Sequence, residues 1–183
     1  HQLDGDWSTP NIFQFTKGPR LNNTMSLDPR SMERLDYLVH CLKQEGIYIY
    51  MDHLTYRRFR SGDNVPGADV MDFAGRPYAN FDPRLIELQK LFIEQFWTHV
   101  NPYTGLAYKD DPAIAMTDLM SEDDLFTKGL MQNLIEPYRT QLEEHCLAFC
   151  RKHGLPMPAT PIEFAAKEPS VLKFLLHQQI VFY

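Results

Sequence analysis

A group of acidic residues directly follows a short apolar run in the second half of the chain. The apolar run is Ala113–Met116, and the carboxylates after it are Asp118, Glu122, Asp123 and Asp124. A short apolar run with a proline before it and a polar cluster after it is typical of a buried parallel strand. Because parallel α/β folds keep their reactive groups at the carboxyl ends of strands, we expect these acids to lie at a functional site.

Proton transfer is the chemistry that such a carboxyl group can perform. Donating a proton near neutral pH needs a raised pKa, which partial burial beside other carboxylates supplies, and Glu122 is the candidate. The alternative is a solvated acidic turn, in which Glu122, Asp123 and Asp124 cap a following helix. Asp118 and Asp52 also stand at predicted strand ends, and we expect both to be structural.

A capped helix and a strand form the first of two units that would position these acids. Asp28 can cap the free amides and Pro29 suits the first helical position, after which apolar residues recur at helical spacing through Leu42. Gly46 is expected to end the helix, and the β-rich run Ile47–Met51 follows at once. A helix joined to a strand by a single glycine indicates part of a parallel sheet.

The second unit repeats this plan 54 positions later. Phe81–Arg84 carries the same start signal as Leu27–Arg30, and the predicted helix buries an apolar stripe that ends near Val100. The strand Ala113–Met116 then leads to the acidic cluster. This recurrence of capped helix, turn and strand predicts an α/β fold with parallel strands and flanking helices.

A long connection, residues 55–80, separates the two units. Loops of more than about 15 residues without secondary structure are usually functional lids or linkers. This one contains Tyr56 and Arg57, side chains of types that contact substrates. The alternative is a solvated loop without a role.

The last third of the chain is predicted to be helical. One helix covers residues 130–153 with an interruption at Pro137, and another begins near Pro169 and runs to Tyr183. Three potential metal ligands lie on one face of the first of these helices: Cys146, Cys150 and His153. Ligands on a single helix diverge and no fourth is evident, so the pattern favours buried thiols on a packed face.

Composition excludes several classes of protein. With 18 Lys and Arg against 24 Asp and Glu in 183 residues, the chain has no electrostatic footprint for nucleic acid. No apolar run approaches the roughly 20 residues of a membrane helix, and three cysteines do not make a disulfide framework. The length predicts a single domain.

Four pieces of the sequence together resemble a known enzyme family. They are the loop His1–Ser8, the strand region Gly46–Asp52, the long stretch Asn101–Ala115 and Glu122. In this combination the chain is similar to glycoside hydrolases of the (β/α)8-barrel clan, the broad family 5-like group that contains cellulases and mannanases. The resemblance covers most of residues 1–126 and weakens after them.

The resemblance implies a retaining hydrolysis of β-linked glycosides with Glu122 as the general acid/base. Ser121 stands where that family has an asparagine that donates a hydrogen bond to the 2-hydroxyl of the sugar. The predicted substrate-binding residues are Trp7, Ser121, Tyr56 and Arg57. No metal or cofactor is implied, and the implied partner is a carbohydrate substrate. A polysaccharide substrate would favour a secreted or periplasmic location.

A complete barrel needs about 250 residues. We therefore expect residues 1–183 to form one partial catalytic domain, about the first half of a barrel. The remainder of the barrel, with the nucleophile on its seventh strand, would then be a further partner. Such a segment alone is expected to aggregate or dimerise. Two alternatives stay open: a carbohydrate-binding relative without activity, and a self-contained flavodoxin-like domain with a five-stranded sheet.

Overall fold

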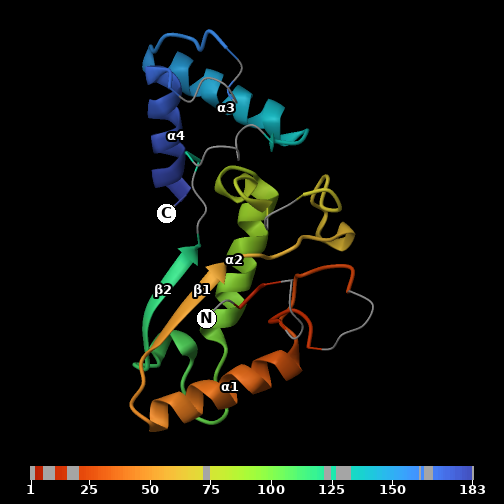
Figure 1. The fold of residues 1–183 in the computed structure, drawn as a ribbon, viewed down its shortest axis with the longest axis vertical. Helices are drawn as coiled ribbons and strands as arrows, with labels where there is room; N and C mark the ends of the chain where they lie inside the picture. The colour runs from red at the N-terminus through yellow and green to blue at the C-terminus, as the bar shows by residue number, and fades with distance from the viewer. Residues whose placement is uncertain are drawn as a thin grey trace. The chain divides into compact units, whose positions relative to one another are not determined.

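The structure is a computed structural model that describes residues 3–5, 11–15, 21–71, 75–121, 125–126, 133–160, 162 and 167–182 (Figure 1). The single domain expected from the length is divided here into two compact units. The first unit comprises residues 1–74 and 87–122, and the second comprises residues 75–86 and 123–183. The candidate site residues described below belong to the first unit.

Helix α1, Pro29–Gln44, begins and ends where its sequence signals predict. The Asp28 carboxylate accepts hydrogen bonds from the backbone N–H groups of Arg30 (2.9 Å) and Ser31 (3.1 Å), which satisfies two donors that the first helical turn leaves free. At the other end, Gly46 adopts a left-handed conformation with φ of 69°. The predicted aspartate cap at the start of this helix and the predicted glycine at its end are therefore confirmed.

Strand β1, Ile49–Leu54, starts two residues later than the sequence indicates and continues three residues further. The reason is local. The Ile47 N–H donates to the Leu42 carbonyl at 2.9 Å, so this residue closes the end of α1 and does not join a sheet.

Helix α2, Pro83–Thr98, connects β1 to strand β2, Ile114–Met120. The Asp82 carboxylate caps α2 by accepting from the Leu85 N–H at 3.0 Å. The strands pair in parallel, and Figure 1 shows them side by side with α2 next to β1. Parallel strands joined by a helix form a β–α–β unit, so the prediction of an α/β arrangement with parallel strands is confirmed.

The core of the first unit lies on one face of this small sheet. It brings together the apolar stripes of α1 and α2, strand β1 and loop residues, and its members include Met32, Leu35, Val39, Ile49, Met51, Phe92, Phe96, Ile12, Phe13 and Tyr108. Val100, which we expected to extend the buried stripe of α2, lies beyond the end of the helix and is exposed.

Strand β2 differs from the buried strand that its apolar sequence predicts. Residues 115–117 are exposed, and only the flanking Ala113 and Met120 are buried. Among the described residues, α1 and α2 supply the core against one face of β1, whereas Tyr50 and Met116 on the other face remain exposed. An apolar run alone does not distinguish burial on both faces from burial on one.

The second unit packs helix α3, Tyr138–His153, against helix α4, Pro169–Phe182. Helix α3 begins directly after Pro137, and Gly154 closes it in a left-handed conformation. Cys146 and Cys150 are buried, as the helical spacing predicts, whereas His153 is exposed. Burial raises the pKa of the Cys146 thiol to about 12 with help from the adjacent Cys150, so this thiol stays protonated at neutral pH.

The portion of the chain that the structure describes contains one sheet, with two strands. It does not contain the five-stranded sheet of a flavodoxin-like domain. None of its helices has both the length and the apolar composition needed to cross a bilayer.

Candidate functional site

Two carboxylates and a phenol meet on the open face of the sheet. Asp52 of β1 pairs directly with Asp118 of β2, and Tyr50 pairs with Met116 one step earlier along the strands. Side chains two positions apart on a strand share a face, so Tyr50 lies on the face that carries both acids. Desolvation and the hydrogen bonds and charges of these acids raise the pKa of Tyr50 to about 12.

One oxygen of this acidic pair has no partner among the described residues. Asp52 Oδ1 is shielded from solvent, and no donor in the described part of the chain forms a hydrogen bond with it. Asp118 Oδ1 accepts from the Met120 N–H at 3.3 Å. Two like charges directly opposite each other on neighbouring strands repel, and a buried acceptor without a donor costs free energy. A ligand that donates hydrogen bonds to Asp52 and Asp118 would offset both effects.

His53 fixes the strand pair from the opposite face. Its Nδ1 lies 3.1 Å from the Asp118 carbonyl oxygen and 2.8 Å from the Thr117 hydroxyl. Because a carbonyl oxygen can only accept, we place the proton on Nδ1. The ring stacks on Trp97 and meets Phe96 edge to face. His53 therefore holds the backbone of Asp118 beside β1.

The carboxyl edge of the sheet brings together two of the predicted substrate-binding residues. The Ser121 N–H donates to the Leu54 carbonyl at 2.9 Å, which extends the pairing one residue beyond β2. Tyr56 follows β1 at the same edge, where its N–H donates to the buried carboxylate of Asp4 at 3.2 Å. Burial raises the pKa of Asp4, although its hydrogen bonds with Thr55 and Tyr56 act against this shift.

Arg57, another predicted substrate-binding residue, lies in the core with 1% of its surface exposed. Its guanidinium donates to both the hydroxyl and the carbonyl of Thr24 and to the Leu88 carbonyl, at 2.9 to 3.0 Å. It also lies over the rings of Phe13 and Phe59 at 4.7 and 5.0 Å. These contacts join three segments of the first unit, and substrate contact by Arg57 stays a prediction that its burial does not favour.

The remaining predicted residues fall outside the described part of the chain. These are Glu122, with its neighbours Asp123 and Asp124, and Trp7. The structure therefore brings Ser121 and Tyr56 to one edge and places Arg57 in the core of the first unit. Glu122 is the residue that follows Ser121.

The meeting of Tyr50, Asp52 and Asp118 was missed by reasoning from the sequence, which treated both acids as structural. Side chains alternate between the two faces of a strand, so the sequence of β1 already indicates that Tyr50 and Asp52 share a face. Which residue of β2 lies opposite Asp52 depends on the register, for which the sequence carries no local signal.

The arrangement is suited to binding a ligand rich in hydroxyl groups. Carboxylates accept hydrogen bonds from hydroxyls, and an exposed tyrosine offers an apolar ring face beside them. The part of the chain described here has no group of three or more His, Cys, Asp or Glu side chains placed to hold a metal ion.

Comparison with known proteins gave no match to a family model, a curated protein or a solved structure.

Proposed function

We propose that this chain is part of a retaining glycoside hydrolase that cleaves β-linked oligo- or polysaccharides. In this proposal β1 and β2 are consecutive strands of a (β/α)8 barrel, and Glu122 is the general acid/base. The observation that carries the proposal is the cluster of hydrogen-bonding side chains on the open face of the sheet: Asp52 lies opposite Asp118, beside Tyr50. The family resemblance of the sequence is the second support.

The geometry favours a site at the carboxyl edge of the two strands. Ser121 lies at this edge, where its N–H donates to the Leu54 carbonyl at 2.9 Å. In the proposal Glu122, the next residue in the sequence, acts at the same edge, and a neighbouring carboxylate would favour its protonated form. A protonated Glu122 would donate its proton to the departing glycosidic oxygen.

The other side chains would bind the sugar. Asp52 and Asp118 would accept hydrogen bonds from ring hydroxyls, and Ser121 would donate one to the 2-hydroxyl. The resemblance places the nucleophile on a strand later in the barrel than β2. Such a pair of carboxyl groups lies about 5 Å apart in retaining enzymes.

The decisive experiment replaces Glu122 by glutamine, which cannot donate a proton to the leaving group. Turnover of natural β-glucan or β-mannan oligosaccharides should fall about 10²- to 10⁴-fold, with binding retained. An aryl glycoside with a dinitrophenolate leaving group needs little protonation, so formation of the covalent intermediate should be much less affected. Asp123→Asn and Asp124→Asn are the matched controls, and we expect both to change the rates little.

A carbohydrate-binding protein without activity is the second candidate, and Ser121 is the observation that favours it. Serine reaches less far toward a 2-hydroxyl than the asparagine of the family does. Ser121→Asn should raise turnover if that contact limits the rate. Saturable oligosaccharide binding without turnover in the unchanged protein would support the second candidate. Unchanged turnover of both substrates by Glu122→Gln would remove Glu122 from the mechanism, and absence of both binding and turnover would overturn both candidates.

A further inference from the structure

Two histidines from different helices lie close together in the second unit. His153 is the last residue of α3 and His177 is in α4, and the centroids of their rings are 6.3 Å apart. Both residues are exposed to solvent, and both helices belong to the same unit. The pair is therefore separate from the candidate site on the sheet of the first unit.

Phe149 of α3 packs against both histidine rings. Its ring centroid lies 4.4 Å from that of His153 and 4.9 Å from that of His177, on which it stacks. Phe149 also contacts the buried ring of Phe174 in α4, at 5.7 Å. Because Phe149 connects the pair to the packed side of α4, the two histidines are brought together before any ligand binds, which reduces the entropy lost on binding.

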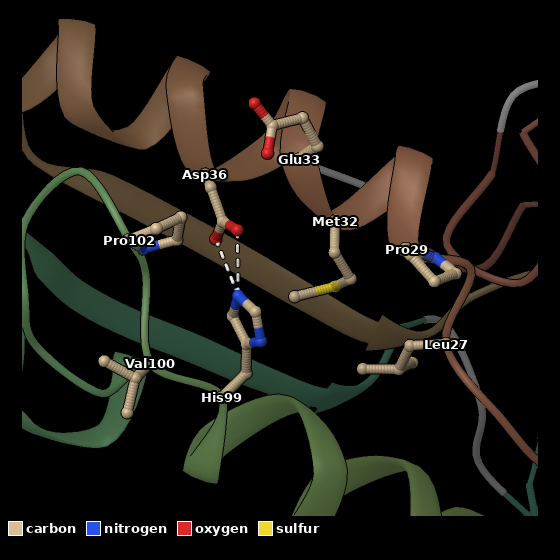
Figure 2. A pocket seen from close by; sticks show the side chains of 8 residues that line it. All are labelled: Leu27, Pro29, Met32, Glu33, Asp36, His99, Val100 and Pro102. Carbon is tan, nitrogen blue, oxygen red and sulfur yellow. Dashed lines mark hydrogen bonds and ion pairs between the residues drawn. The ribbon is translucent and has the colours of Figure 1, made fainter.

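The ring nitrogens of this pair are open to a ligand, unlike those of two histidines in the first unit. His99 Nε2 lies 2.8 and 3.0 Å from the two oxygens of Asp36, in the wall of the cavity that Figure 2 shows. His53 is fully buried. By contrast, no hydrogen bond or ion pair within the described residues occupies a ring nitrogen of His153 or His177.

The separation of the two rings fits coordination of one metal ion. Histidine is the commonest metal ligand in proteins, and its imidazole suits zinc, copper and nickel. With a metal–nitrogen bond of about 2.0 to 2.1 Å, two imidazoles on one ion have ring centroids roughly 5 Å apart at the tetrahedral angle and about 6 Å apart on opposite sides of the ion. The observed 6.3 Å is near the upper end of this range. A small rotation of the exposed side chains therefore brings one nitrogen of each ring to a common ion.

The charges around the pair decide which class of ion it fits. Arg151 and Lys152 directly precede His153 in α3. Lys173 lies one turn before His177 in α4. Mg²⁺ and Ca²⁺ need several oxygen ligands, and no group of three or more His, Cys, Asp or Glu side chains in the described residues could supply them. The affinity must therefore come from bonds to nitrogen, which transition metals form.

We propose that His153 and His177 bind one divalent transition-metal ion, such as Zn²⁺, which links the end of α3 to α4. Solvent would complete the coordination of the ion. The three potential ligands that the sequence places on one face of α3 thus have different roles. Cys146 and Cys150 are buried thiols, whereas His153 pairs with a histidine of the neighbouring helix.

The experiment titrates the whole chain with ZnCl₂ and, separately, with MgCl₂ by isothermal calorimetry. Saturable binding of Zn²⁺ and no saturable binding of Mg²⁺ are the expected results. His153→Gln and His177→Gln should each weaken zinc binding roughly tenfold or more, because a single imidazole cannot chelate the ion. For the same reason, the double variant should bind little more weakly than either single variant. His145→Gln, at a half-buried position of α3, is the matched control and should not change the affinity.

The link between the two helices provides a second measurement. An ion that binds the folded pair stabilises the folded state, so ZnCl₂ should raise the midpoint of urea denaturation of the unchanged protein and of His145→Gln. This rise should be absent in His153→Gln and His177→Gln, and far-ultraviolet circular dichroism checks that both variants are folded. Equal binding of Zn²⁺ and Mg²⁺, zinc affinity that survives either substitution in the pair, an equal loss in His145→Gln, or absence of zinc binding would each overturn the proposal.

Discussion

His53 is fully buried, and its contacts show how one residue supports the sheet. Its ring lies among Phe92, Phe96 and Trp97, and its Nδ1 lies beside the carbonyl oxygen of Asp118. Burial lowers the pKa of His53, although the hydrogen bond to Asp118 acts in the opposite direction. The neutral ring is therefore the form that the folded protein favours.

This burial predicts a pH dependence of stability. Between the ordinary histidine pKa of 6.5 and the lowered pKa of the folded protein, His53 is protonated in the unfolded chain and neutral in the folded chain. The unfolded state therefore binds more protons in this range. The contribution of His53 to the free energy of unfolding should therefore be greatest above pH 6.5. It should decrease as the pH falls toward the lowered pKa. Urea denaturation at a series of pH values measures this slope.

His53→Phe keeps an aromatic ring among the same neighbours and removes the titration, so its slope between pH 7 and pH 5 should be smaller. The variant will be less stable at all pH values, because it loses the hydrogen bonds with Thr117 and Asp118. His40→Gln, at a half-buried position on α1, is the matched control and should keep the slope of the unchanged protein. An unaltered slope in His53→Phe would show that other groups cause the pH dependence.

At the scale of the elements, both helices that flank the sheet start from an aspartate followed by a proline. Asp28 accepts from two backbone N–H groups at the start of α1, and Asp82 accepts from Leu85 at the start of α2. The proline that follows each aspartate lacks the N–H that would be unsatisfied at that position. The direction in which α1 enters the fold thus depends on a few adjacent residues.

Asp28→Ala should reduce the free energy of unfolding by about 1 kcal/mol, because two backbone donors lose their acceptor. Asp28→Asn keeps a side-chain oxygen and should cost much less. Asp69→Ala removes an exposed aspartate from the long connection and serves as the control. The midpoint of urea denaturation compares the stability of the three variants. Equal midpoints for Asp28→Ala and Asp69→Ala would exclude a capping role for Asp28.

At the scale of the whole molecule, the open face of the sheet exposes apolar side chains. Tyr50 and Met116, which pair across the two strands, are 44% and 65% exposed. Exposed apolar groups beside unpaired strand edges promote association between chains. The aggregation or dimerisation that the sequence predicts would therefore arise at this face.

Met116→Lys should reduce self-association, because a charge at this position opposes burial of the patch against a second copy. Sedimentation velocity over a range of protein concentrations measures the change. Val70→Lys introduces the same charge at an exposed position of the long connection and is the matched control. A protein that is monomeric at all concentrations before substitution would contradict the prediction.

The local features of this protein were determined by its sequence. The start of α1 at Asp28 and its end at Gly46, the start of α2 at Asp82, and the parallel strands on either side of α2 were all predicted. Each of these boundaries depends on hydrogen bonds between residues a few positions apart, or on backbone conformations that one residue type favours. Such interactions are present in any short segment that contains those residues.

Contacts between distant segments were decided by the tertiary structure. Asp36 and His99 are 63 positions apart, and Asp52 faces Asp118 only in the observed register. Arg57 follows a strand in the sequence, where a solvated or substrate-binding side chain was expected, yet aromatic rings and carbonyl groups from three segments enclose it. Burial and pairing of this kind depend on which surfaces meet when the chain folds, and no short pattern of residues contains that information.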